Sequence, residues 1–208
     1  MKFYRLLGAS LGWFAIFTQY WLSTTEDGVV HGTIIYFSYF SILGNILVAT
    51  AFTAPLLPAS PSKDFFLNPG VRTAIGVYIL IIAVIFHLLL RNVEHVTGLG
   101  WYDNALFHYI MPLLYLLDWV VFVPKRDLTF RQIPFWLIFP VAYVCYTLAH
   151  GAASGFYPYP FLDVRAHGYP QILTNIGGLT MLFIGVSGGF IVVGRYVAIP
   201  LTGESRTS

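Results

Sequence analysis

Long apolar runs alternate along the chain with short segments rich in charged residues, proline or glycine. A helix needs about 20 apolar residues to cross the hydrocarbon core of a bilayer. Runs of this length occupy approximately residues 4–23, 30–54, 72–92, 104–123, 132–151 and 172–195. The pattern predicts an all-α integral membrane protein, built as a bundle of six transmembrane helices.

The composition supports a membrane protein and argues against a soluble domain. Hydrophobic residues make up 57% of the 208 positions and charged residues 10%, whereas a soluble domain carries about 25% charged residues. The start "MKFYRLLGASLGWFAIF" has no clear small-x-small cleavage site after its apolar run, so we expect an uncleaved first span. We expect a single transmembrane domain over residues 1–200, followed by a short cytoplasmic tail, 201–208.

The basic residues are distributed unevenly among the predicted connections. With the N-terminus inside, only Arg91 and Arg165 of the eleven lysines and arginines fall outside. Cytoplasmic loops carry the excess of basic residues, so both termini are predicted to be cytoplasmic. There is no basic run with interleaved aromatic residues, which argues against a nucleic-acid partner. The sequence leaves the oligomeric state open.

Two ionisable residues lie inside the fourth run, "ALFHYIMPLLYLLDWVVFV". With 1.5 Å of rise per residue, His108 lies roughly 24 Å and Asp118 about 9 Å from the inner boundary. This separation predicts different roles for them. We expect a structural role for Asp118, satisfied by Lys125, Arg126 or a polar neighbour on another helix. A polar stripe expected to face the bundle interior comprises Asn104, His108, Met111, Tyr115, Asp118 and Trp119.

A second polar stripe is predicted in "HGTIIYFSYFSILGN", where Ser38, Ser41 and Asn45 follow helical spacing. Ser41 lies roughly 21 Å above the inner boundary by the same rise, near the level of His108. Small polar residues also serve simply to pack membrane helices and to hydrogen-bond across them, and that alternative remains open.

A serine and a histidine at one depth permit acyl transfer. Neutral imidazole is the usual base for a serine nucleophile, so we predict a Ser41–His108 dyad. No convincing carboxylate accompanies the histidine. The oxyanion of such a reaction needs hydrogen-bond donors. The candidates for this role, or for contacting polar parts of a substrate, are Asn45, Asn175, Ser38 and Tyr115.

The connection "GFYPYPFLDVRAHGYP" precedes the last run and alternates tyrosine with proline. Such a segment is stiff and amphipathic, and it suits the level of the lipid headgroups. We expect Tyr157, Tyr159, Asp163 and Arg165 to lie at the mouth of a cavity that this loop caps. The alternative is an ordinary interfacial loop.

Three stretches, "YFSYFSILGN", "FHYIMPLLYLLDW" and "YPYPFLDV", together with the six-span plan, resemble a bacterial branch of the androgen-induced gene family. The resemblance implies an intramembrane hydrolase without a cofactor, acting on fatty acid esters of hydroxy fatty acids. It implies placement in the bacterial inner membrane, and the depths of Ser41 and His108 predict a site in the outer leaflet half. The family's catalytic threonine falls on Ser41 and its histidine on His108, so serine replaces threonine here.

Two further functions remain possible from the residues. His87, His108 and His150 lie at similar depth on three runs and could bind zinc or haem iron. The chain has no HExxH or CxxCH motif, so we expect no metal. Alternatively, the protein binds or transports lipid without cleaving it, with Asp118 as a proton-coupled group.

Overall fold

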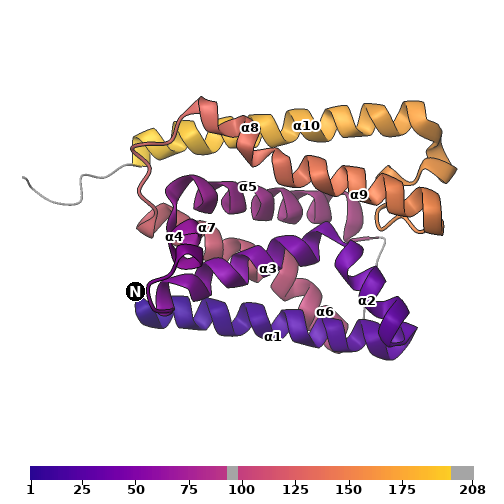
Figure 1. The fold of residues 1–208 in the computed structure, drawn as a ribbon, viewed down its shortest axis with the longest axis horizontal. Coiled ribbons are helices and arrows are strands. Elements are labelled where there is room, and N and C mark those ends of the chain that lie inside the picture. Colours follow the sequence, from indigo (N-terminus) through magenta and orange to yellow (C-terminus); the bar gives the residue numbers. More distant parts are fainter. Residues whose placement is uncertain (93–97, 198–208) are drawn as a thin grey trace, which may run out of the picture.

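The computed structural model describes residues 1–92 and 98–197, and every regular element within these ranges is helical (Figure 1). The predicted tail, 201–208, lies outside the described residues. The first half contains α1 (Lys2–Asp27), α2 (Val29–Ser38), α3 (Phe40–Thr53), η1 (Ala54–Leu56), α4 (Pro61–Leu67), α5 (Pro69–Ile85) and η2 (Phe86–Leu90). The second half contains α6 (Leu99–Ala105), η3 (Leu106–Ile110), α7 (Met111–Phe122), η4 (Phe130–Gln132), α8 (Ile133–Trp136), α9 (Ile138–Ser154), η5 (Pro160–Leu162) and α10 (Val164–Val197).

Several helices are long and apolar enough to cross a membrane. Within the described ranges these are Pro69–Leu90, Leu99–Phe122, Phe130–Ser154 and Val164–Tyr196. A fifth candidate is the pair Val29–Ser38 and Phe40–Leu56, which bends by 79° at a break. The 26 residues of α1 are less apolar, because serine, threonine, glutamine and tyrosine interrupt the run. The all-helical architecture is therefore confirmed, whereas six spans remain a prediction.

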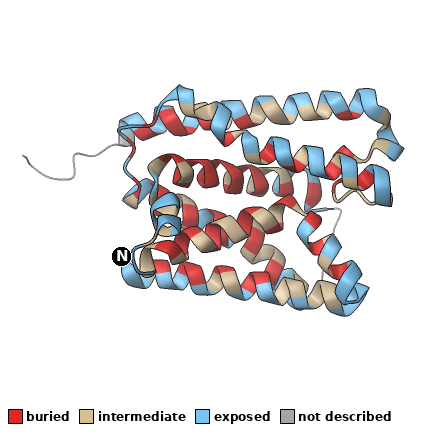
Figure 2. Ribbon diagram, in the orientation of Figure 1, coloured by how far each residue is buried: buried red, intermediate tan, exposed pale blue. Residues whose placement is uncertain are grey.

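The helices pack as a bundle around α5. On one side α3 lies between α5 and α1, and on the others α5 contacts α7 and α10. Buried residues follow nearly the whole length of α5, whereas α1, α9 and α10 expose their outer faces (Figure 2). A helix that is apolar all round belongs in the middle of such a bundle. The N-terminal end of α1 and the C-terminal end of α10 lie at the same end of the bundle (Figure 1).

A buried ionic cluster joins three helices near the end of the bundle that holds the N-terminus. Asp118 of α7 is fully buried and accepts hydrogen bonds from Arg5 of α1, over 3.3 Å, and from Arg72 of α5. Lys125, one expected partner, instead donates to two carbonyls at the C-terminal end of α7. Two arginines on other helices, rather than Lys125, thus satisfy the carboxylate.

Candidate functional site

The second apolar run is two helices rather than one. Tyr39, with φ −86° and ψ 128°, has extended backbone and separates α2 from α3. The prediction that Ser38, Ser41 and Asn45 share one helical stripe is therefore wrong, because the stripe assumed an unbroken helix. The hydroxyl of Ser38, the last residue of α2, donates to the carbonyl of Ile34 one turn back.

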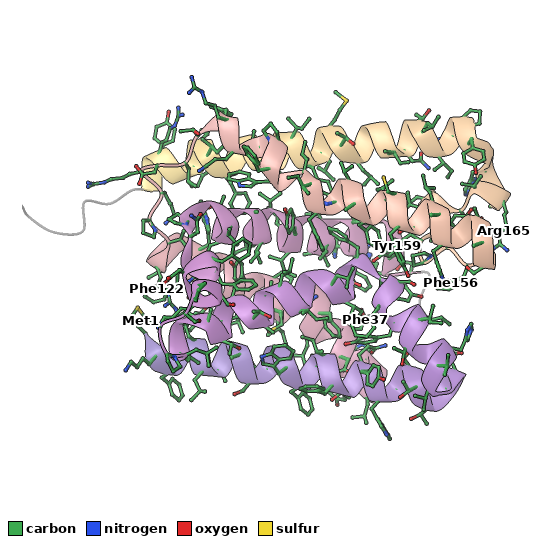
Figure 3. The ribbon with its side chains drawn as sticks, viewed as in Figure 1. Met1, Phe37, Phe122, Phe156, Tyr159 and Arg165 are labelled. Carbon is green, nitrogen blue, oxygen red and sulfur yellow. The ribbon has the colours of Figure 1, made fainter. Side chains whose placement is uncertain are left out.

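Tyrosine hydroxyls satisfy the polar backbone groups that the break frees. Tyr143 donates to the carbonyl of Ser38 over 2.8 Å, and the Tyr146 hydroxyl lies 2.9 Å from the Ser38 hydroxyl. Tyr159 lies in the loop after α9 (Figure 3), and its hydroxyl accepts from the backbone N–H of Ser41 over 3.2 Å. Irregular backbone inside a membrane is tolerated only where protein groups pair with it. Tyr143 and Tyr159 pair with the backbone at this break, and Tyr146 pairs with the Ser38 side chain.

The break places Ser41 in the first turn of α3. The N–H groups of a first helical turn have no partner within the helix, and they carry the positive end of the helix dipole. Burial raises the pKa of Tyr159 to about 12, and hydrogen bonds with the Ser41 side chain and backbone oppose that rise. The Tyr159 hydroxyl therefore stays protonated at neutral pH and provides a donor beside Ser41.

His108 lies in a second irregular segment, the π-helix Leu106–Ile110. Pro112 follows four residues later, and it has no N–H to donate to the carbonyl of His108. Its ring would also clash with that carbonyl in a regular α-helix. The backbone widens instead, and Met111 donates to the carbonyl of Leu106, five residues back. Such single-turn π segments are rare and occur frequently at functional sites.

The imidazole of His108 is held on two sides. Its ring stacks on Phe86, with centroids 3.8 Å apart and planes 13° from parallel. Its Nδ1 lies 3.1 Å from the carbonyl oxygen of Asn104. A carbonyl only accepts, so Nδ1 carries the proton and Nε2 keeps its lone pair. In that tautomer Nε2 is the atom able to take a proton.

Ser41, His108 and Tyr159 line one cavity of about 700 Å³. Its wall is largely apolar and includes isoleucine and phenylalanine side chains from α3, α5 and α10 and from the short segments η2, η3 and η5. Among the hydrogen bonds of residues 1–92 and 98–197, none joins Ser41 to His108. The structure therefore brings the two predicted catalytic residues to one apolar cavity without direct contact between them.

The four predicted oxyanion or substrate-contacting residues do not line this cavity. The Asn45 amide donates to the carbonyls of Ser41 and Phe107, and the Asn175 amide donates to that of Phe161. Tyr115 donates to the carbonyl of Arg72, close to the ionic cluster. The Ser38 hydroxyl makes hydrogen bonds with the carbonyl of Ile34 and the hydroxyl of Tyr146 at the helix break. Each of these side chains binds other parts of the protein.

The three histidines considered as metal ligands have separate surroundings. His87 contacts Tyr109 and Arg91 through its two ring nitrogens, and His150 stacks on Tyr146. Neither lines the cavity that contains His108. Within the described ranges, no group of three or more histidine, cysteine, aspartate or glutamate side chains is arranged to hold a metal ion.

The loop between α9 and α10 only partly matches the prediction of a cavity mouth. Tyr159 reaches the cavity, but Tyr157, Asp163 and Arg165 do not line it. Arg165 pairs with Asp163 over 3.4 Å and lies over the ring of Tyr157. Burial raises the pKa of the Asp163 carboxyl, but hydrogen bonds with the side chain and backbone of Arg165, together with its charge, outweigh burial and lower the pKa below its usual value. These three residues stabilise the loop that carries Tyr159.

Sequence reasoning missed the role of the tyrosines in α9 and the carboxylate of Asp103. Tyr143 and Tyr146 are spaced three apart in an apolar run, which marks one helix face without naming its partner. Asp103 is buried in α6 with its Oδ2 atom unpaired among the described residues. It precedes the fourth run, where it resembled a loop residue.

Comparison with protein-family models, with curated proteins and with solved structures finds no match to this chain. The resemblance to the androgen-induced gene family thus rests on the three quoted stretches and the helix pattern alone. Function has to be inferred from the cavity.

Proposed function

We propose that the protein is an intramembrane hydrolase of fatty-acyl esters, with Ser41 as nucleophile and His108 as general base. The observation that carries the proposal is the cavity itself. It joins a serine in the first turn of a broken helix to a histidine whose free nitrogen is Nε2. Its apolar wall suits an acyl chain, and an ester carbonyl is the electrophile that a serine–histidine pair attacks.

In the first step, the Ser41 oxygen forms a bond to the carbonyl carbon of the ester, and Nε2 of His108 takes the hydroxyl proton. The carbonyl oxygen becomes an oxyanion. We assign its stabilisation to the Tyr159 hydroxyl, which contacts the backbone of Ser41, and to the first-turn N–H groups of α3. Oxyanion stabilisation by such fixed donors is commonly the largest electrostatic contribution in acyl transfer.

The oxyanion then collapses and the bond to the alcohol oxygen breaks. His108 returns the proton to that oxygen, so a neutral alcohol leaves and the acyl group stays on Ser41. Water attacks this acyl-enzyme, His108 takes one proton from it, and the fatty acid is released as Ser41 regains its hydrogen. Because Ser41 and His108 lie on one cavity without a direct hydrogen bond, substrate or a small shift of η3 must complete the alignment.

Labelling of the purified protein by a fluorophosphonate probe tests the nucleophile. We expect Ser41 to be labelled in the wild type and labelling to be lost in Ser41→Ala and in His108→Ala. Ser187→Ala is the matched control for the serine, because Ser187 is a buried serine of α10 whose hydroxyl makes no hydrogen bond among the described residues and which does not line the cavity. His150→Ala is the control for the histidine. Labelling that persists in Ser41→Ala contradicts the assignment.

A lipid-binding protein without hydrolytic activity is the second candidate, and the absence of a Ser41–His108 hydrogen bond favours it. The two candidates differ in a simple measurement. A binding protein extracted in mild detergent carries acyl lipid, but it shows neither fluorophosphonate labelling nor release of fatty acid from monoacylglycerols or hydroxy fatty acid esters.

A further inference from the structure

The cavity reaches the molecular surface in two chemically different places. Exposed residues that also line it mark each opening. At one opening these are Glu26 and Asp27, at the C-terminal end of α1. At the other they are Val141, Cys145 and Leu173, on α9 and α10. One opening is therefore acidic and lies at a helix end, whereas the other is apolar.

The apolar opening lies between the lengths of two helices. Its wall continues inward through Val144 and Leu148 of α9 and through Ile176 and Leu179 of α10. Both helices are long and apolar enough to cross a membrane. A gap between two such helices, away from their ends, faces the hydrocarbon of a bilayer rather than water.

We propose that the gap between α9 and α10 is a lateral portal, through which the acyl chain of a membrane lipid enters from the bilayer and reaches Ser41. The inference rests on the proposed function, since it assigns the route and the chain-binding subsite of that same cavity. An acyl chain suits this route because it moves from one apolar environment to another without contacting water. The acidic opening at Glu26 and Asp27 disfavours an apolar chain and remains for water and polar products.

Photolabelling tests the portal without requiring turnover. The probe is a monoacylglycerol with a diazirine in the middle of a palmitoyl chain, added to Ser41→Ala protein in liposomes. We expect cross-links to the inward faces of α9 and α10, identified by mass spectrometry of the peptides. The double variant Val141→Trp with Leu173→Trp places two tryptophans at the mouth of the portal. It should reduce this labelling roughly tenfold, as steric exclusion from an apolar pocket does.

Control variants carry the same tryptophans on the same helices outside the cavity. Ile138 on α9 is 62% exposed and Met181 on α10 is 76% exposed, and neither lines the cavity. Ile138→Trp with Met181→Trp should therefore label like the parent protein. Cys145, the single cysteine of the chain, gives a second measurement. The unlabelled monoacylglycerol should slow its reaction with N-ethylmaleimide, because the chain passes beside it.

The portal is contradicted if the mouth variant labels as strongly as its control, or if Glu26→Trp blocks labelling in its place. Failure of the proposed function gives a different result. In that case wild-type protein shows no fluorophosphonate labelling, whereas photolabelling between α9 and α10 still responds to the mouth tryptophans.

Discussion

Two polar regions inside the bundle differ in how their charged and titratable groups are satisfied. Near the end that holds the N-terminus, Arg5 and Arg72 enclose the carboxylate of Asp118, and aromatic side chains fill the space around them. Toward the other end, His108 and Ser41 border a cavity of about 700 Å³. The first region is packed and paired, whereas the second borders a cavity and pairs only Nδ1 of the imidazole with a carbonyl among the hydrogen bonds of the described residues.

This difference separates the structural role of Asp118 from the catalytic role that we propose for His108. A carboxylate that already accepts hydrogen bonds from two guanidinium groups has little capacity left for a substrate. An imidazole that borders a cavity and has only one nitrogen bonded to a carbonyl has that capacity. In the sequence, Asp118 and His108 look alike, because both are ionisable groups in one apolar run. Only the groups that they contact in the structure distinguish them.

The largest effect on stability is expected at the ionic cluster. Asp118→Ala leaves two buried arginines without their counter-charge, and breaking a buried pair in this way costs about 3–5 kcal/mol of stability. We expect poor yield in detergent and a strongly lowered Tm in fluorescence-detected thermal unfolding. Asp127→Ala removes an exposed carboxylate from the neighbouring loop and should leave Tm nearly unchanged. Equal behaviour of the two variants contradicts a structural role for Asp118.

Features that depend on neighbouring residues in the sequence are predicted well, whereas features that depend on contacts between distant residues are not. Apolar run lengths correctly predict membrane-length helices, because a helix satisfies its own backbone wherever it lies. Helical spacing correctly predicts that His108 faces the interior. The break at Tyr39 escaped prediction, since the tyrosines that stabilise it come from α9 and the following loop, more than a hundred residues away. Asn45 and Asn175 appeared available for the same reason, as their partners are backbone carbonyls of distant elements.

A smaller effect is expected at the helix break. Tyr143→Phe removes the donor to the buried carbonyl of Ser38 and leaves that carbonyl unpaired, which costs about 1–3 kcal/mol. Tyr146→Phe should cost less, because the Ser38 hydroxyl keeps its bond to the carbonyl of Ile34. Thermal unfolding of the two variants beside wild type measures the difference. If Tyr146→Phe is the more destabilising, the tyrosines do not support the break as the contacts indicate.

The smallest change in stability, with a clear change in reactivity, is expected at Pro112. Alanine restores an N–H that can bond the carbonyl of His108, so the π-helix can become a regular α-helix. When the wider π-helical turn becomes an α-helical turn, the residues before it rotate by about 100° relative to α7. His108 then loses its stack on Phe86 and its direction toward the cavity.

Stability should change by no more than about 1 kcal/mol in Pro112→Ala, because the gain of one hydrogen bond offsets the lost ring stacking. The rate of fluorophosphonate labelling should fall roughly 10- to 100-fold, the usual effect of a misplaced catalytic group. Pro124→Ala, in the exposed loop after α7, is the matched control and should label at the wild-type rate. An unchanged rate in Pro112→Ala means that the π-helix does not position the base, and the contrast between the two polar regions then rests on the cavity alone.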